Sequence, residues 1–131
     1  MNNFLSKYKF IFYLSNLFLI FLYLFPDSLF GCFFYDDCKL QPSIAPDFVV
    51  SFNHLFAFSV LSLIGFSTYK KSGHLNFLII YLILLSILLE MIHIIIPERS
   101  FELIDLFGNI LGVLIVIIIN YFFKKYENFK N

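Results

Sequence analysis

The sequence predicts an all-α integral membrane protein, built as a four-helix bundle with both termini in the cytoplasm. The chain has 131 residues, of which 60% are hydrophobic and only 14% are charged. A soluble domain is nearer a quarter charged, so this chain has too little polar surface to cover a water-soluble fold. Several apolar runs also reach the ~20 residues that a helix needs to cross a bilayer. The length suffices for one domain, and a soluble helical bundle is disfavoured.

Four segments predict the membrane-spanning helices of this bundle. The third should stop at Pro97, which cannot continue the helical hydrogen-bond ladder, and Ser100 is the expected N-cap of the fourth. The first resembles a secretory signal peptide, but its span-like length favours a retained helix. The four segments run from about Tyr8 to Phe25, Phe48 to Tyr69, Leu75 to Ile96 and Ser100 to Phe123.

The positions of lysine and arginine predict the orientation of the chain. Seven of the nine basic residues fall on one side of the predicted spans, and this side is assigned to the bacterial cytoplasm because basic loops stay there. The chain then divides into a first helix with an external loop (1–47), a three-helix core (48–123) and a basic cytoplasmic tail (124–131). The seven residues are Lys7, Lys9, Lys70, Lys71, Lys124, Lys125 and Lys130.

Two cysteines, Cys32 and Cys38, lie in the loop that this orientation places outside. They match neither a zinc spacing nor a CxxC redox motif. An oxidising compartment permits a disulfide between them, but spacing alone does not establish pairing. A bridge and two free thiols therefore both remain open.

Polar residues at matching depth on three predicted helices form the strongest functional signal. Ionisable groups in hydrocarbon are costly, so they are expected to face one another inside the bundle. They should line a small polar pocket that opens outward beneath Arg99. Function is favoured over packing alone, because interhelical packing normally uses Ser, Thr, Asn or Gln. The predicted pocket residues are His54, Glu90, His93, Arg99, Asp105 and Asn109.

A GxxxG pair, Gly108 and Gly112, predicts close approach of the fourth helix to a neighbour. The neighbour is either another helix of the same chain or a second copy in a homo-oligomer.

The polar residues resemble the motif of the VanZ-like family of small membrane proteins, over about residues 48–119. The resemblance rests on Glu90-x-x-His93, Pro97-x-Arg99, Asp105, Asn109 and Gly112, and on His54 followed by Phe56-Ala57-Phe58. The family usually has Gln where His93 stands, and often an Asp-Lys pair where this chain has Val50 and Ser51. The resemblance implies a multispanning cell-envelope protein, similar to a founding member that is linked to glycopeptide resistance. It implies no settled reaction.

Three functions compete on these observations. The favoured one is binding of membrane lipid or a lipid-linked envelope precursor, with Arg99 facing an anionic headgroup. The alternative for Arg99 is an interfacial residue paired with Glu98 or Glu102. The second function is an enzyme using His54 or His93 as acid or base, with or without a metal; no metal or other cofactor is favoured. The third, an ion-coupled transporter, lacks the broken helices and inverted repeat of that class. The net charge of zero excludes a general basic surface for nucleic acid.

Overall fold

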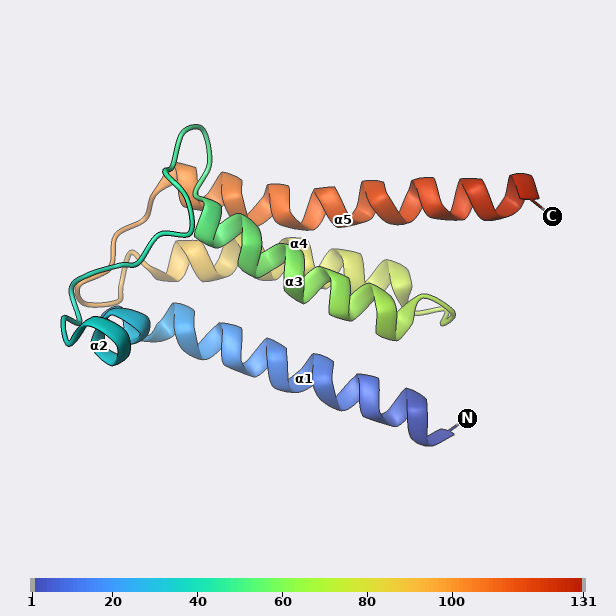
Figure 1. Cartoon of the computed structure of the whole chain (residues 1–131), viewed down its shortest axis with the longest axis horizontal. Helices are drawn as coiled ribbons and strands as arrows, with labels where there is room; N and C mark the ends of the chain where they lie inside the picture. Colours follow the sequence, from blue (N-terminus) through green and yellow to red (C-terminus); the bar gives the residue numbers. More distant parts are fainter. Residues whose placement is uncertain (1, 131) are drawn as a thin grey trace.

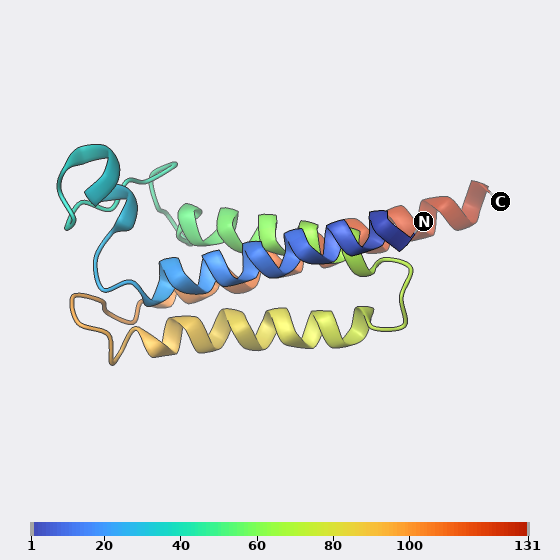
Figure 2. The same cartoon turned by 90° about the horizontal axis from the view of Figure 1, so that it is seen from below.

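The computed structural model describes residues 2–130, with side chains from Tyr8 onward, and contains five helices and no strand in that part of the chain. Four long helices lie side by side, and a short one sits across one end (Figures 1 and 2). The two termini and the turn between α3 and α4 lie at the opposite end from the short helix. The side chain of Lys7 lies outside the described residues. The helices are α1 (Asn2–Leu24), α2 (Leu29–Tyr35), α3 (Phe52–Tyr69), α4 (Leu75–Ile92) and α5 (Leu103–Lys130).

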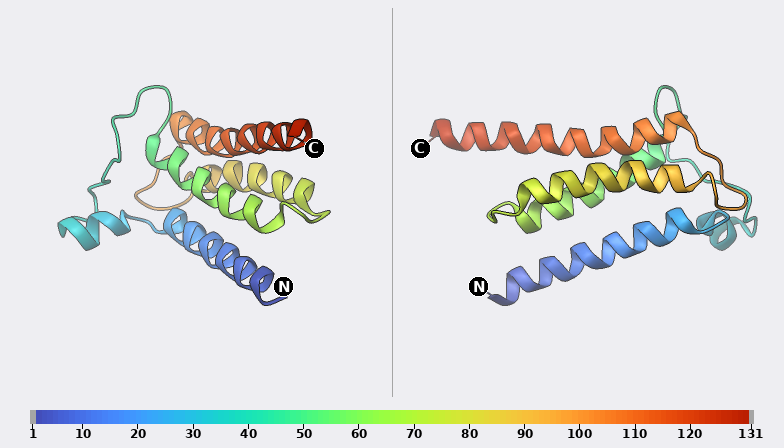
Figure 3. Two further views of the ribbon diagram at one scale, coloured as in Figure 1. Left: turned by 45° about the vertical axis from the view of Figure 1, so that its right-hand side comes forward. Right: turned by 180° about the vertical axis from the view of Figure 1, so that it is seen from behind.

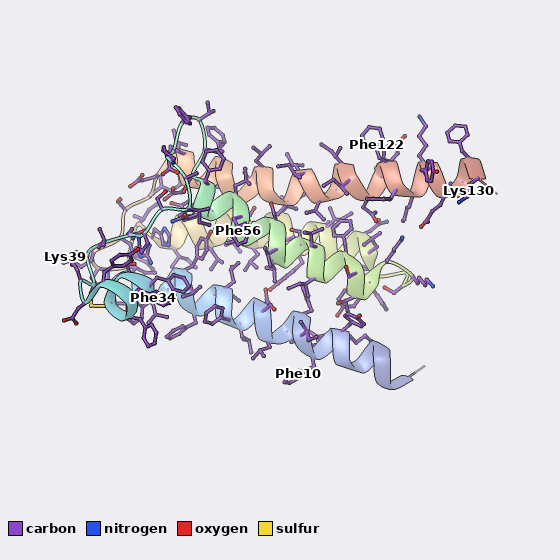
Figure 4. All side chains as sticks on the ribbon, in the orientation of Figure 1. Phe10, Phe34, Lys39, Phe56, Phe122 and Lys130 are labelled. Atoms are coloured by element: carbon purple, nitrogen blue, oxygen red, sulfur yellow. A yellow bond between two sulfur atoms is a disulfide. The ribbon has the colours of Figure 1, made fainter. Side chains whose placement is uncertain are left out.

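Three of these helices, α3, α4 and α5, are long and apolar enough to cross a membrane. A fourth span results if α1 from Tyr8 onward is counted together with α2, although the two helices are bent by 86° at the break between them. The exposed side chains agree with a lipid environment, because large apolar groups such as Phe10 and Phe122 project outward from α1 and α5 (Figure 4). The chain is therefore an all-α, multispanning membrane protein.

The connection between α4 and α5 differs from the predicted one. The third long helix ends at Ile92 rather than Ile96, and the backbone N–H groups of His93, Ile94 and Ile95 each bond three residues back. Such tightened turns commonly close a helix, so the chain leaves the helix before Pro97 is reached. The next helix begins at Leu103, and Ser100 is not its N-cap, because its hydroxyl bonds the Glu102 carboxylate instead.

The remaining boundaries also move. The second long helix begins at Phe52 rather than Phe48, after Ser51 in extended conformation. The last helix continues through the predicted tail to Lys130. At 28 residues it is about 42 Å long, which exceeds the thickness of the hydrocarbon core of a bilayer by about 12 Å.

The segment between α1 and α3, which the charge pattern predicts to be external, contains α2, a helix that was not predicted. Ser28 caps this helix by accepting a hydrogen bond from the Gly31 N–H, and Asp36 ends it with a left-handed φ of 53°. A Cys32–Cys38 disulfide ties the helix to the following loop, so of the two open alternatives the structure contains the bridge. The yellow bond in Figure 4 lies beside Lys39, at the end of the molecule far from Lys130.

Close packing of α3 on α5 organises the bundle. A Cβ added to Gly108 would lie 2.6 Å from the Ser51 carbonyl oxygen, and one added to Gly112 would lie 2.6 Å from that of Leu55. Of the two predicted neighbours, the glycines therefore contact another helix of the same chain. An oligomer through the same face would have to displace α3. In the reverse view of Figure 3, α4 lies in front of α3, and the buried core runs between the helices.

Candidate functional site

The predicted polar residues meet at the end of the bundle near α2, where two helices end and two begin. His54 is the third residue of α3, Asp105 is the third residue of α5, and Glu90 lies in the last turn of α4. Because α4 stops at Ile92 rather than Ile96, Glu90 lies only two residues before the end of its helix. The cluster is therefore closer to the helix ends than the predicted boundaries imply.

Glu90 is the centre of this cluster. Its side chain is completely buried, and its Oε1 accepts a hydrogen bond of 3.0 Å from the backbone N–H of Glu102. That N–H precedes α5, where unpaired amides and the helix dipole favour a negative charge. Glu90 thereby fixes the hairpin between α4 and α5. Its other oxygen, Oε2, is buried without a hydrogen-bond partner among the described residues.

His54 lies between two carboxylates. Its Nδ1 is 2.9 Å from the Ser51 hydroxyl and 3.4 Å from Asp105 Oδ1. Its Nε2 is 3.9 Å from Glu90 Oε2. The side chains of His54 and Asp105 keep 13% and 18% of their surface exposed, so the cluster remains accessible from one side.

His93 follows the last turn of α4 and is almost fully buried. Its Nε2 lies 3.1 Å from the carbonyl oxygen of Tyr23, and its Nδ1 lies 3.4 Å from Glu90 Oε2. A carbonyl oxygen only accepts, so Nε2 carries a proton and donates it.

Sequence reasoning missed Tyr23 and Ser51. The Tyr23 ring stacks on His93 with centroids 5.6 Å apart and meets His54 edge-on at 5.2 Å. Its hydroxyl donates a 2.5 Å hydrogen bond to Asn109 Oδ1, and Asn109 Nδ2 donates to the Ser86 carbonyl. Counting depth along the first helix would have found Tyr23, because it lies one residue before the end of α1.

Arg99 lies in the loop between α4 and α5 and lines the cavity together with His54, but its hydrogen bonds to α1 were not predicted. The chain turns with Pro97 at the second position, Glu98 at a φ of 61° at the third, and an Arg99 N–H to Ile96 carbonyl bond, the pattern of a type II turn. This turn presents Arg99 to the end of α1. Its Nε donates to the Phe25 carbonyl, and its Nη2 donates to those of Leu22 and Asp27.

The guanidinium therefore holds the C-terminal end of α1 against the hairpin, where helix carbonyls favour a cation. None of the three bonds uses Nη1. Partial burial lowers the pKa of Arg99, and the nearby Tyr23 and the carboxylates of Asp105 and Glu90 act in the opposite direction. Arginine remains charged under such opposing effects.

A cavity of about 840 Å³ adjoins the cluster between α1 and α3. Tyr23, His54 and Arg99 line its polar end, and the loop containing Pro42 and Ile44 covers it together with α2. Asn53 fixes this cover, because its amide accepts from the Ile44 N–H and donates to the Pro42 carbonyl.

Most of the rest of the cavity wall is apolar, although Ser15, Gln41 and Asn53 also line it. Several of its apolar lining residues, such as Phe18 and Phe56, are also exposed on the surface of the bundle, which lipid surrounds in a membrane protein. The wall includes Phe18, Leu22, Phe34, Phe56, Ala57 and Val60.

No protein-family model, curated protein or solved structure matches this chain significantly. The likeness to VanZ-like proteins thus depends on the motif residues alone. What the chain itself establishes is a multispanning, all-α membrane protein with a buried polar cluster at the end of its bundle near α2.

Proposed function

We propose that this protein binds an anionic membrane amphiphile, a lipid or a lipid-linked envelope precursor, in the cavity between α1 and α3. The observation that carries the proposal is the combination of a long apolar wall with a polar end on a cavity of about 840 Å³. Ligand sites are commonly of this size, mostly apolar, with a few polar groups that set orientation. An acyl or prenyl chain fits the wall, and a headgroup fits the polar end.

Arg99 and His54 are the groups that would receive this headgroup. The Nη1 of Arg99 is not used in its bonds to α1, and His54 lines both the cavity and the polar cluster. Phosphate oxygens accept well from guanidinium donors. Because Arg99 also holds α1, its loss is expected to change the cavity as well as its charge.

The sharpest test fills the cavity without touching Arg99. We expect Val60→Phe and Ala57→Phe to reduce the anionic amphiphile that copurifies in mild detergent, because the added ring occupies the space of the apolar chain. Ile118→Phe on α5 is the matched control, since Ile118 is exposed and does not line the cavity. Native mass spectrometry of the three variants and the unchanged protein measures the retained ligand.

Equal retention by all four proteins would contradict the proposal. So would a wild-type protein that retains only zwitterionic lipid, because the cationic end of the cavity would then have no part in selection.

We further propose that the chain is a VanZ-like protein of the bacterial cytoplasmic membrane that modulates envelope properties such as glycopeptide susceptibility. The gathering of Glu90, His93, Asp105 and Asn109 with His54 in one cluster supports it, because residues of one motif would meet in one site. Expression in a susceptible bacterium should raise the inhibitory teicoplanin concentration, and Ala57→Phe should remove that increase.

A membrane-embedded enzyme is the second candidate. It is favoured by one arrangement: His54 borders the cavity with Asp105 near its Nδ1, and a carboxylate that orients one ring nitrogen is typical of a histidine acid or base catalyst. Turnover of a lipid-linked substrate that His54→Asn abolishes, while His74→Asn on the exposed turn does not, would establish it.

A further inference from the structure

The polar cluster contains one carboxylate oxygen without a hydrogen-bond partner among the described residues, although ring nitrogens of two histidines lie near it. This oxygen is Glu90 Oε2, and the Glu90 side chain is completely buried. A buried carboxylate oxygen in this state is costly, because it has lost water and gained nothing in exchange.

One of these nitrogens is Nδ1 of His93, 3.4 Å from Glu90 Oε2. The other nitrogen of this ring, Nε2, donates to the Tyr23 carbonyl and fixes the ring in place.

The second nearby nitrogen is Nε2 of His54, 3.9 Å from Glu90 Oε2. The Ser51 hydroxyl lies 2.9 Å from Nδ1 of this ring and can hold a proton there, which leaves the lone pair of Nε2 available to a cation. Asp105 Oδ1 lies 3.4 Å from the same ring, so one imidazole and two carboxylates lie together.

We propose that His54, Glu90 and Asp105 form a site for one divalent transition-metal ion, of the Zn²⁺ or Mn²⁺ class. One ligand atom from each residue lies within 4.8 Å of the other two. Ligands around a tetrahedral ion are separated by about 3.4 Å when the bonds are about 2.1 Å long, so small rotamer changes close the site. An imidazole with two carboxylates suits zinc and manganese, and a ligand set without thiolate disfavours softer ions.

The surroundings resemble those of known metal sites in three respects. Ser51 fixes the ring of His54 through Nδ1, and the Glu102 N–H fixes Glu90 through Oε1. The carboxylates of Glu90 and Asp105 face a single arginine, Arg99, which leaves the cluster attractive to a positive ion. The partial exposure of His54 and Asp105 provides the entry path, from the cavity side.

Metal content of the purified protein tests this directly. Tag-free protein in mild detergent is stripped with chelator, equilibrated with Zn²⁺ or Mn²⁺, desalted and measured by elemental analysis. We expect about one ion per chain at saturation. Glu90→Gln, His54→Asn and Asp105→Asn should each weaken binding at least ~10-fold, since even supporting residues of metal sites contribute 10- to 100-fold.

The controls change the same residue types elsewhere. His74→Asn alters an exposed histidine in the turn between α3 and α4, and Asp36→Asn alters an exposed aspartate whose left-handed conformation asparagine tolerates. Both should bind metal as the unchanged protein does. Glu90→Gln keeps the acceptor for the Glu102 N–H, and circular dichroism verifies that each variant is folded.

Either of two results would overturn the proposal: an unchanged protein that retains no ion, or cluster variants that retain as much as the controls. An unchanged protein that retains no ion would mean that a shared proton, rather than a metal ion, partners Oε2 of Glu90. Co²⁺ absorption bands that the unchanged protein develops and His54→Asn lacks would support the site independently. Amphiphile retention measured on the same samples separates this outcome from that of the proposed function.

Discussion

The hydroxyl of Tyr23 links α1 to the cluster through a single donor. It bonds Asn109 Oδ1, and Asn109 in turn bonds the backbone of α4 through Ser86. Removing the hydroxyl leaves a completely buried amide oxygen without its donor. In a membrane protein such interhelical bonds contribute about 0.6 kcal/mol on average, with larger values where the partner is left unpaired.

We therefore expect Tyr23→Phe to destabilise the folded protein by about 1 kcal/mol, which is more than that average because the Asn109 oxygen loses its donor. Tyr13→Phe is the matched control, because its hydroxyl bonds Tyr69 at an exposed position. It should change the free energy of unfolding by less than ~0.5 kcal/mol. Reversible unfolding in mixed micelles measures both, and equal effects would refute the special role of the buried bond.

At this scale the sequence predicted which residues gather but not what each one contacts. Counting residues from the ends of the predicted helices correctly grouped Glu90 with Asp105, because the two residues flank one short hairpin and so lie at the same end of the bundle. It could not predict the contacts of Arg99, whose three backbone partners belong to the end of α1, far away in sequence. It was not applied to Tyr23, because an aromatic residue in an apolar run gives no polar signal.

At the scale of whole elements, α3 and α5 approach each other through two positions without side chains. A Cβ at Gly108 or Gly112 would lie 2.6 Å from a backbone carbonyl oxygen, and such an oxygen cannot rotate away. Any larger residue must separate the helices and with them His54 and Asp105, one on each helix.

Gly112→Ala should consequently lower stability by about 1–3 kcal/mol, the usual cost of forcing extra volume into a packed contact. Gly73→Ala is the control: an added Cβ there meets nothing within 4 Å, so it should be neutral or slightly stabilising. Thermal unfolding of the two variants in the same detergent distinguishes them, and similar midpoints would show that the glycines do not determine the contact.

Helix boundaries were less predictable than helix existence. Apolar runs identified α3, α4 and α5, but three-residue turns ended α4 before Pro97 and moved His93 out of the helix. The short α2 was missed because its seven residues give no periodic pattern of their own. Its cap at Ser28 and the disulfide that follows are tertiary features that a hydropathy pattern does not contain.

For the whole molecule, the two ends differ in charge and covalent chemistry. Both described termini lie with the Lys70–Lys71 turn, whereas the disulfide and the polar cluster lie at the other end (Figures 1 and 4). The charge distribution predicts that the lysine end faces the cytoplasm.

Labelling of single cysteines in intact cells tests this assignment, in a chain from which Cys32 and Cys38 have been removed by substitution with serine. A membrane-impermeant maleimide should label Ser100→Cys without permeabilisation. It should label Gly73→Cys only after the membrane has been opened, because that turn faces the cytoplasm. Labelling of both sites in intact cells, or the reverse order, would invalidate the orientation and the outward opening of the site.

If the ligand of the cavity between α1 and α3 enters from the membrane, the fraction of occupied protein depends on the concentration of that ligand in the bilayer. A molecule that enters from the surrounding lipid never crosses bulk water, so its driving concentration is a mole fraction in the bilayer. A hydrophobic chain gains little by moving from lipid into an equally apolar wall, and selectivity must come from the headgroup end. Occupancy should therefore follow the composition of the outer leaflet, and diluting the vesicles in buffer should leave it unchanged.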